Sequence, residues 1–262
     1  MAPAQHNQRN SAAGSADAPA DLARVFSEQQ VAERLRSASP TAYAAAERYW
    51  RAAFQAGTLS PRMTELVLVA LYATSTSLYA EGVRRHVARA LAAGATEQDV
   101  LDVVTTIVGV SNHALYSAVP VLMRELKAAG HSDAFPLARE TQAIKEEFVR
   151  ARGFWNEQRD AIARAMPAYF AALTNISTEP WKNGSLTEKE RQLICIAIDC
   201  TVTHMYEPGL VIHIRHALQK GASAEEILAV YHLAALIGLE SYILGGEALF
   251  GPDRCTTSAN AV

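Results

Sequence analysis

Two tyrosine–glycine–histidine triplets carry the side chains of this sequence that are best suited to proton transfer. They are Tyr79, Gly82 and His86 in "SLYAEGVRRHVARALAAGAT" (77–96), and Tyr206, Gly209 and His213 in "HMYEPGLVIHIRHALQKGAS" (204–223). Spacings of three and four residues place each triplet on one face of a helix. Histidine suits a general acid or base near neutral pH, and a tyrosine hydroxyl suits the stabilisation of an oxyanion. The glycine leaves room for a small ligand, or it only allows close helix packing.

The triplets belong to an internal duplication. Tyr206 follows Tyr79 by 127 residues, and His213 follows His86 by the same 127. Without a gap, this offset also pairs Pro40 with Pro167, Gly57 with Gly184, Thr74 with Thr201, Thr76 with Thr203, and Gly94 with Gly221. A period of this length indicates a duplicated domain rather than a solenoid. We predict two copies at 26–125 and 151–250, a linker at 126–150, and disordered tails at 1–25 and 251–262.

Each copy has the sequence pattern of helices, and no stretch alternates as a strand would. Ser60 and Thr187 are N-cap candidates ahead of apolar helices. The helix that carries each triplet ends at a glycine, Gly94 or Gly221, which suits a left-handed C-cap. Thr96 or Ser223 then caps a long apolar third helix. We predict an all-α fold, a duplicated helical domain.

Bulk composition narrows the function classes. Half of the 262 residues are hydrophobic and 19% are charged, as in soluble globular proteins. The net charge of −3 argues against a dedicated nucleic-acid binder. Three cysteines make no disulfide framework, so we expect a reducing cytoplasm. The apolar stretch 227–250 is long enough for a membrane span, but His232, Glu240 and Glu247 interrupt it, and we predict a buried helix.

Each copy resembles the carboxymuconolactone decarboxylase and alkylhydroperoxidase D (AhpD-like) superfamily. The resemblance rests on the helix cap, the apolar helix after it, a second helix that ends in H-x-x-x-A-L-x-x-G-A-[ST], and the acidic start of the next helix. The resemblance covers roughly residues 40–125 and 167–250. It implies helical units that assemble as trimers or hexamers, with active sites between helices of adjacent units. For this chain it implies a homotrimer that carries six copies.

Both characterised pockets of that superfamily are altered here. The peroxidase branch has cysteines seven and four residues before the histidine, where both copies of this chain have the tyrosine and the glycine of the triplet. Cys195 and Cys200 align with Leu68 and Ala73 and are predicted core residues. The decarboxylase branch has a glutamate at the glycine position and a later Y-x-G-x-P segment, and both are missing. The resemblance therefore supports the scaffold more strongly than either reaction.

Two polar residues interrupt the third helices at corresponding positions, His113 and Glu240. A buried imidazole or carboxyl group must be paired or neutral, so each is either a structural hydrogen-bonding group or a perturbed acid or base. We expect Glu240 to accompany His213, and His113 to accompany His86. Glu207 and Glu81 lie nearby in the two copies.

Histidine spacing also raises the possibility of a metal site. His213 and His216 form H-x-x-H, and His204 and His232 lie in the same copy. A third ligand at convincing spacing is lacking, so we predict no metal and no cofactor. Arg84 and Arg85 are either a solvated face or a contact for a substrate carboxylate.

The leading hypothesis is a cofactor-free acid–base enzyme, a decarboxylase or related lyase or isomerase of a small organic acid or lactone, as in the breakdown of aromatic compounds. The predicted catalytic residues are His86, His213, Tyr79 and Tyr206. The predicted substrate-binding residues are Gly82, Gly209, Thr76, Thr203, His113 and Glu240. The alternatives are an AhpD-like peroxidase, disfavoured without the paired cysteines, and a non-catalytic binding or assembly protein. The expected partners are a small-molecule substrate and further copies of the chain, with no nucleic acid and no membrane.

Overall fold

The computed structural model describes residues 21–55, 58–131, 135 and 139–252, and it is all-α over these residues. The α-helices are α1 (Gln29–Ala38), α2 (Pro40–Gln55), α3 (Pro61–Ala73), α4 (Ala80–Ala92), α5 (Glu97–Ile107), α6 (His113–Ala128), α7 (Arg139–Arg152), α8 (Glu157–Ala165), α9 (Pro167–Asn183), α10 (Glu188–Asp199), α11 (Glu207–Gln219), α12 (Ala224–Leu236) and α13 (Glu240–Phe250). Short 3₁₀ helices are η1 (Leu22–Val25), η2 (Val108–Asn112) and η3 (Ile237–Leu239). The prediction of an all-α fold is confirmed.

The duplication is visible in the order of the helices, because α2 to α6 correspond to α9 to α13. The predicted caps form in both copies: Ser60 and Thr96 in the first, Thr187 and Ser223 in the second, accept hydrogen bonds from backbone N–H groups of their helices. Gly94 and Gly221 have φ angles of 91° and 83°, the left-handed conformation expected after a helix. Local sequence therefore sets these boundaries in both copies.

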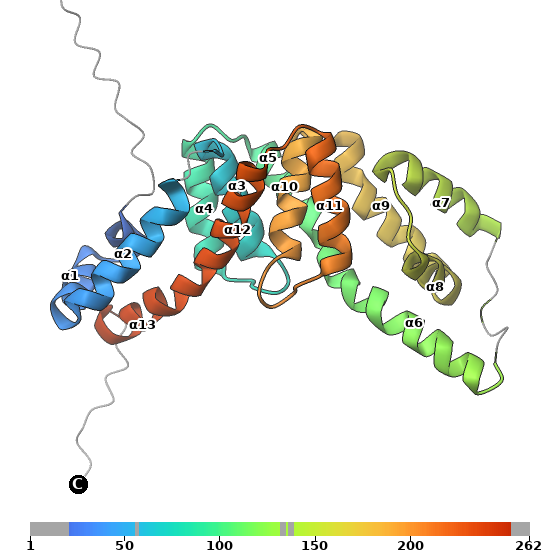
Figure 1. The fold of residues 1–262 in the computed structure, drawn as a ribbon, viewed down its shortest axis with the longest axis horizontal. Coiled ribbons are helices and arrows are strands. Elements are labelled where there is room, and N and C mark those ends of the chain that lie inside the picture. The colour runs from blue at the N-terminus through green and yellow to red at the C-terminus, as the bar shows by residue number, and fades with distance from the viewer. Residues whose placement is uncertain (1–20, 56–57, 132–134, 136–138, 253–262) are drawn as a thin grey trace, which may run out of the picture.

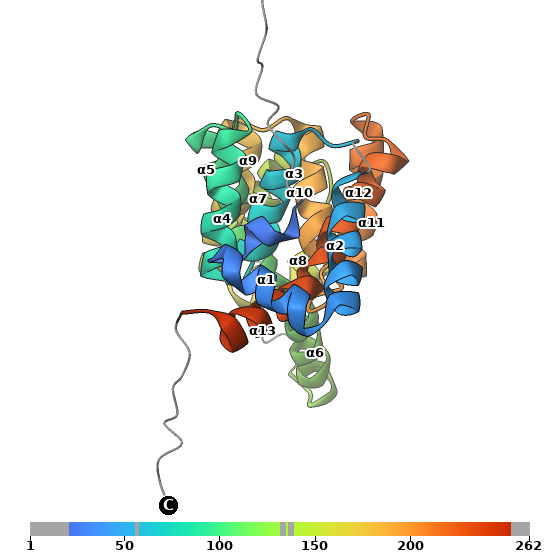
Figure 2. The ribbon, with the colours of Figure 1, turned by 90° about the vertical axis from the view of Figure 1, so that its left-hand side faces the viewer.

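The main core lies where the two copies meet. Helices α3 and α10 pack side by side at the centre of the molecule, and α4, α5, α11 and α12 surround them (Figures 1 and 2). The stretches Met63–Tyr72 and Arg191–Asp199 of these two central helices are almost entirely buried, which explains the apolar runs in their sequences. Two smaller clusters flank this core, one between α1, α2 and α13 and one between α6, α8 and α9.

The predicted third helix of each copy is broken. A 3₁₀ segment, η2 or η3, interrupts it at the level of Gly109 or Gly238 and redirects the chain. Helix α6 then extends toward α8, whereas α13 extends toward α1 at the opposite end of the molecule (Figure 1). The chain changes direction just before His113, the first residue of α6, and just before Glu240, the first residue of α13.

Two continuous helical stretches, Glu97–Ala128 and Ala224–Phe250, are long and apolar enough to cross a membrane by length and composition. Such stretches are weak evidence, because helices of soluble proteins also have these properties. Their acidic residues Asp102 and Glu240 are buried in ion pairs with Arg191 and Arg85 of this fold. We interpret both stretches as packing helices.

Two segments outside the regularly repeated part of the chain are folded. Residues 21–25 were expected in a disordered tail, but Leu22 is fully buried, so the packed chain begins before residue 26. The expected linker 126–150 contains the end of α6 and most of α7, which packs against α9 and buries Phe148. The remaining tail residues, 1–20 and 253–262, lie outside the described part of the chain.

Candidate active site

A cavity of about 60 Å³ lies in the second copy, between α10, α11 and the segment where α5 passes into α6. Its polar lining includes His113, Arg152, Arg159, Asp199, Tyr206 and His213. His113 comes from the first copy, and the two arginines come from the end of α7 and the start of α8. The cavity is therefore assembled from both copies and from the segment that joins them.

His213 is buried in α11 and is oriented by a neutral partner. Its Nδ1 donates to the side-chain oxygen of Gln192 on α10, at 2.6 Å. The ring therefore presents an unprotonated Nε2, which lies 3.9 Å from Asp199 Oδ2. Burial, together with the positive charge of Arg152, lowers the pKa of His213 well below its ordinary value. His213 is thus a neutral imidazole that can accept a proton.

Asp199 is the last residue of α10 and is only 1% exposed. Its Oδ2 has no hydrogen-bond partner among the described residues. Burial raises the pKa of Asp199 to about 8, so the carboxyl group is largely protonated at neutral pH. A neutral carboxylic acid therefore faces a neutral imidazole, and such a pair provides both an acid and a base.

Tyr206 precedes α11 as its N-cap residue and lines the same cavity. Its ring stacks on His113 with the centroids 3.9 Å apart, and its buried hydroxyl has no hydrogen-bond partner in the described structure. The preceding Met205 has a left-handed φ of 45°, and the Tyr206 N–H donates to the Asp199 carbonyl. A strained turn thus holds the tyrosine, and its hydroxyl is free to donate to a ligand.

Two arginines introduce positive charge without a matching carboxylate. Arg159 is 5% exposed, and its Nε and Nη1 have no hydrogen-bond partners in the described residues; the same holds for Arg152 Nε. The guanidinium groups lie over aromatic rings, Arg152 at 3.5 Å from the Trp181 centroid and Arg159 at 3.9 Å from that of Phe148. Burial lowers the pKa of Arg152 to about 10. A buried cation without a counter-ion is unfavourable, so these groups favour an anionic ligand.

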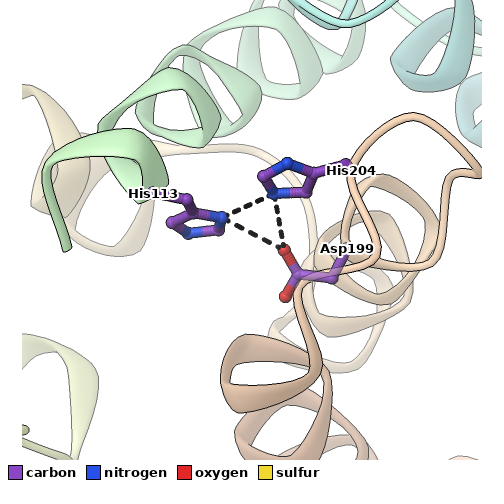
Figure 3. A group of neighbouring side chains, drawn as sticks. All are labelled: His113, Asp199 and His204. Atoms are coloured by element: carbon purple, nitrogen blue, oxygen red, sulfur yellow. Dashed lines mark hydrogen bonds and ion pairs between the residues drawn. The ribbon is translucent and has the colours of Figure 1, made fainter. Parts of the chain in front are cut away.

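A second histidine pair adjoins the cavity. His113 Nδ1 lies 2.7 Å from Nε2 of His204, a residue of the turn between α10 and α11. Asp199 Oδ1 lies 3.6 Å and 3.8 Å from the same two nitrogens. Figure 3 shows the three side chains pointing toward one another from different segments of the chain. Sequence reasoning weighed His204 as a ligand but did not connect it to His113.

The corresponding region of the first copy is closed by hydrogen bonds. His86 is fully buried and its Nδ1 lies 2.7 Å from Glu65 Oε2. Its ring stacks on Tyr72 with the centroids 4.9 Å apart. The Tyr72 hydroxyl donates to Glu240 Oε1 at 2.7 Å, and Arg85 forms an ion pair with the same oxygen at 2.8 Å. The charged groups of this copy are therefore paired with one another, although His86 Nε2 has no hydrogen-bond partner among the described residues.

Both glycines of the triplets are closely approached by a neighbouring side chain, and only Gly209 lines the cavity. A Cβ at Gly82 would lie 2.4 Å from the Tyr72 ring, which fills the room that the sequence analysis assigned to a ligand. A Cβ at Gly209 would lie 2.4 Å from Asp199 Oδ2, but this glycine does line the cavity. Thr76 and Thr203 were predicted to bind substrate, and neither lines the cavity. Tyr79 donates to Glu81 at 3.1 Å, away from the second copy's cavity.

The polar residues expected beside His86 and His213 are found in the opposite copies. Glu240 was expected beside His213, but it contacts Tyr72 and Arg85 of the first copy. His113 was expected beside His86, but it lies with Asp199 and His204 of the second. The breaks at η2 and η3 explain this correction, because they send α6 and α13 out of their own copies.

Several cavity residues were missed from the sequence. Asp199 interrupts the apolar run "ICIAIDC" and aligns with Tyr72, a mismatch that an inspection of polar residues in apolar helices would have found. Gln192 likewise aligns with Glu65. Arg152 and Arg159 gave no such signal, because they lie between the predicted linker and residue 167, outside the span over which the copies align.

The comparisons with known proteins agree with this architecture. The model of the carboxymuconolactone decarboxylase family matches residues 40–129 and 167–241, which together exceed half of the chain. This chain belongs to the carboxymuconolactone decarboxylase family. It is similar to a crystal structure from Burkholderia xenovorans LB400 described as a "putative gamma-carboxymuconolactone decarboxylase subunit". The identity is 30%, the TM-score is 0.80, and the match covers 87% of this chain and 92% of that one. No curated protein matches.

Proposed function

We propose that the cavity of the second copy is an acid–base active site for a small organic acid or lactone that carries a carboxylate, with decarboxylation as the model reaction. One observation carries this proposal: Arg152 and Arg159 have buried guanidinium nitrogens that no carboxylate of the described residues pairs with, in a cavity that also contains an acid and a base. Membership of the family and the similar structure support the same class of reaction.

The chemistry follows from the charges around the cavity. The guanidinium groups of Arg152 and Arg159 bind the substrate's carboxylate. When the bond to a departing carboxylate breaks, CO₂ leaves and the electron pair passes to an adjacent carbonyl, which gives an enolate. The free Tyr206 hydroxyl donates to the enolate oxygen, and protonated Asp199 delivers a proton to carbon. His213 Nε2 faces the protonated Asp199 carboxyl as a hydrogen-bond acceptor, and solvent returns the proton that Asp199 gives to carbon.

The test uses a panel of β-oxo acids and carboxylated lactones, with CO₂ release and substrate loss as readouts. On the substrate that the wild type turns over, Arg159→Gln should lower kcat/KM by about 10- to 100-fold, because a hydrogen bond to a charged group is lost. Arg215→Gln is the matched control, since Arg215 is an exposed arginine of α11. Wild-type kcat/KM in Arg159→Gln, or no turnover of any panel member by the wild type, would contradict the proposal.

The two cysteine thiols that the structure describes are poorly suited to the alternative peroxidase chemistry. Cys195 and Cys200 are free, and burial raises the pKa of each thiol to about 12. Peroxidase chemistry needs a thiolate at neutral pH, and these groups stay protonated there. A purely binding role differs from catalysis in one respect: the His213→Ala variant would then lose affinity for the carboxylate and have no turnover to lose.

A further inference from the structure

We propose that His113, Asp199 and His204 bind a divalent transition-metal ion at the edge of the cavity. The three residues come from the start of α6, the end of α10 and the turn before α11. This proposal concerns ion binding by the folded chain without substrate. It shares Asp199 with the reaction proposed above, because a carboxylate that holds an ion cannot act as the proton donor at the same time.

The separations between the three ligand atoms fit a single ion. The two imidazole nitrogens are 2.7 Å apart, and Asp199 Oδ1 lies 3.6 Å and 3.8 Å from them. A point equidistant from three atoms with these separations lies about 2.0 Å from each, which is the length of Zn–N and Zn–O bonds. The side chains point toward this common space in Figure 3. The ligand atoms therefore already have suitable separations, and the two nearly parallel imidazole rings, which now direct their nitrogens at each other, have to turn to coordinate the ion.

The chemical nature of the ligands favours a transition metal over calcium or magnesium. Two imidazoles and one carboxylate are ligands of zinc and of non-haem iron, whereas calcium and magnesium prefer oxygen alone. His113 and Asp199 line the cavity, so an ion held by them retains coordination positions that face it.

The first copy provides an internal comparison. The residues that correspond to His113, Asp199 and His204 are Glu240, Tyr72 and Ser77, and these cannot form a two-histidine site. Elsewhere in that copy the scaffold pairs its buried polar groups with one another. The nearby Arg152 and Arg159 oppose a cation, so we expect moderate affinity that a bound carboxylate strengthens.

The experiment measures Zn²⁺ binding to the full chain by calorimetry after chelator treatment, without substrate. We expect one zinc ion per chain, and visible d–d absorption of a histidine-bound site when Co²⁺ is used instead. His204→Gln and His113→Gln should each weaken Zn²⁺ binding by at least about tenfold, the scale on which lost site residues act. His204 lies in a turn, so its variant should fold, which a thermal melt verifies.

His232→Gln is the matched control, because it removes an exposed histidine of α12 that belongs to no cluster. Equal weakening in this control would show adventitious binding to surface histidines. Absence of stoichiometric binding by the wild type would show that His113 and His204 form only a hydrogen-bonded pair. Either result overturns the metal site and leaves the acid–base proposal intact. If the protein binds zinc but the Arg159→Gln variant keeps full activity, only the acid–base proposal is refuted.

Discussion

In the first copy, Nδ1 of His86 meets the carboxylate of Glu65, whereas in the second copy Nδ1 of His213 meets the neutral amide of Gln192. Above the ring, the first copy places Tyr72, and the second places the shorter Asp199 at the same aligned position. The larger tyrosine fills the space that the aspartate leaves as part of a cavity. A few substitutions on one scaffold thus separate a closed polar network from an open site.

The two copies also differ in whether their buried positive charges are paired with a carboxylate. Arg85 of the first copy is neutralised by Glu240, and its aligned residue in the second copy is Ile212. The second copy takes its positive charge from Arg152 and Arg159, outside the two family matches, and leaves it without a carboxylate. After duplication, one copy has polar groups that stabilise the fold, and the other has polar groups available to a ligand.

The largest expected effect comes from replacing each of the two histidines, His213 and His86, by alanine. His213→Ala should lower kcat by about two to four orders of magnitude, the range typical of acid–base catalysis, because the proton donor Asp199 loses the imidazole that faces it. His86→Ala should keep kcat within a few fold but lower the melting temperature, because Glu65 loses its buried partner. Turnover on a confirmed substrate and thermal melts measure both. If His86→Ala abolished turnover while His213→Ala did not, the comparison between the copies would be reversed.

The next prediction concerns the closed network of the first copy. Arg85→Ile installs the residue that the second copy has, and it leaves Glu240 buried without its cation. We expect the free energy of unfolding to fall by about 3–5 kcal/mol, as when one partner of a buried ion pair is removed. Arg84→Ile is the control, because Arg84 is exposed on the same helix. Urea denaturation that gave equal stability for both variants would show that the Arg85–Glu240 pair stabilises nothing.

Sequence patterns predicted the helices but not the directions in which α6 and α13 leave their own copies. Caps such as Ser60 and Thr96 and the glycines after α4 and α11 act locally, so their neighbours in the chain suffice to predict them. His113 and Glu240 were recognised as unusual for the same reason. Which histidine each accompanies depends on the 3₁₀ breaks before α6 and α13, and hydrophobic periodicity continues through both breaks. Arg152 reaches the cavity through tertiary packing of α7, which no repeat signal predicts.

Both copies also share exposed apolar positions, which predicts how chains associate. Leu101 and Leu228 are aligned and are 55% and 52% exposed, and Leu122 and Leu249 are aligned and 49% and 62% exposed. Equivalent uncovered faces on both copies fit a ring in which six copies come from three chains. We expect light scattering to give three times 28.3 kDa. A stable monomer at micromolar concentration would contradict the homotrimer, and Leu101→Glu with Leu228→Glu should dissociate it.

The smallest expected effect comes from the cysteines, which distinguish the second copy from the first without contributing to the proposed chemistry. Cys195 and Cys200 replace Leu68 and Ala73, and the high pKa of both thiols keeps them protonated. Cys195 lines the cavity, so its replacement by alanine removes packing volume and costs stability, although no thiolate is lost. Substituting Cys195, Cys200 and Cys255 together by alanine should leave kcat within a few fold; Cys255 lies outside the described residues. Kinetics on the confirmed substrate, with a thermal melt as the control for folding, measure this directly. A folded but inactive triple variant would restore thiol chemistry and remove the assigned difference between the two copies, since a thiol would then be the reacting group.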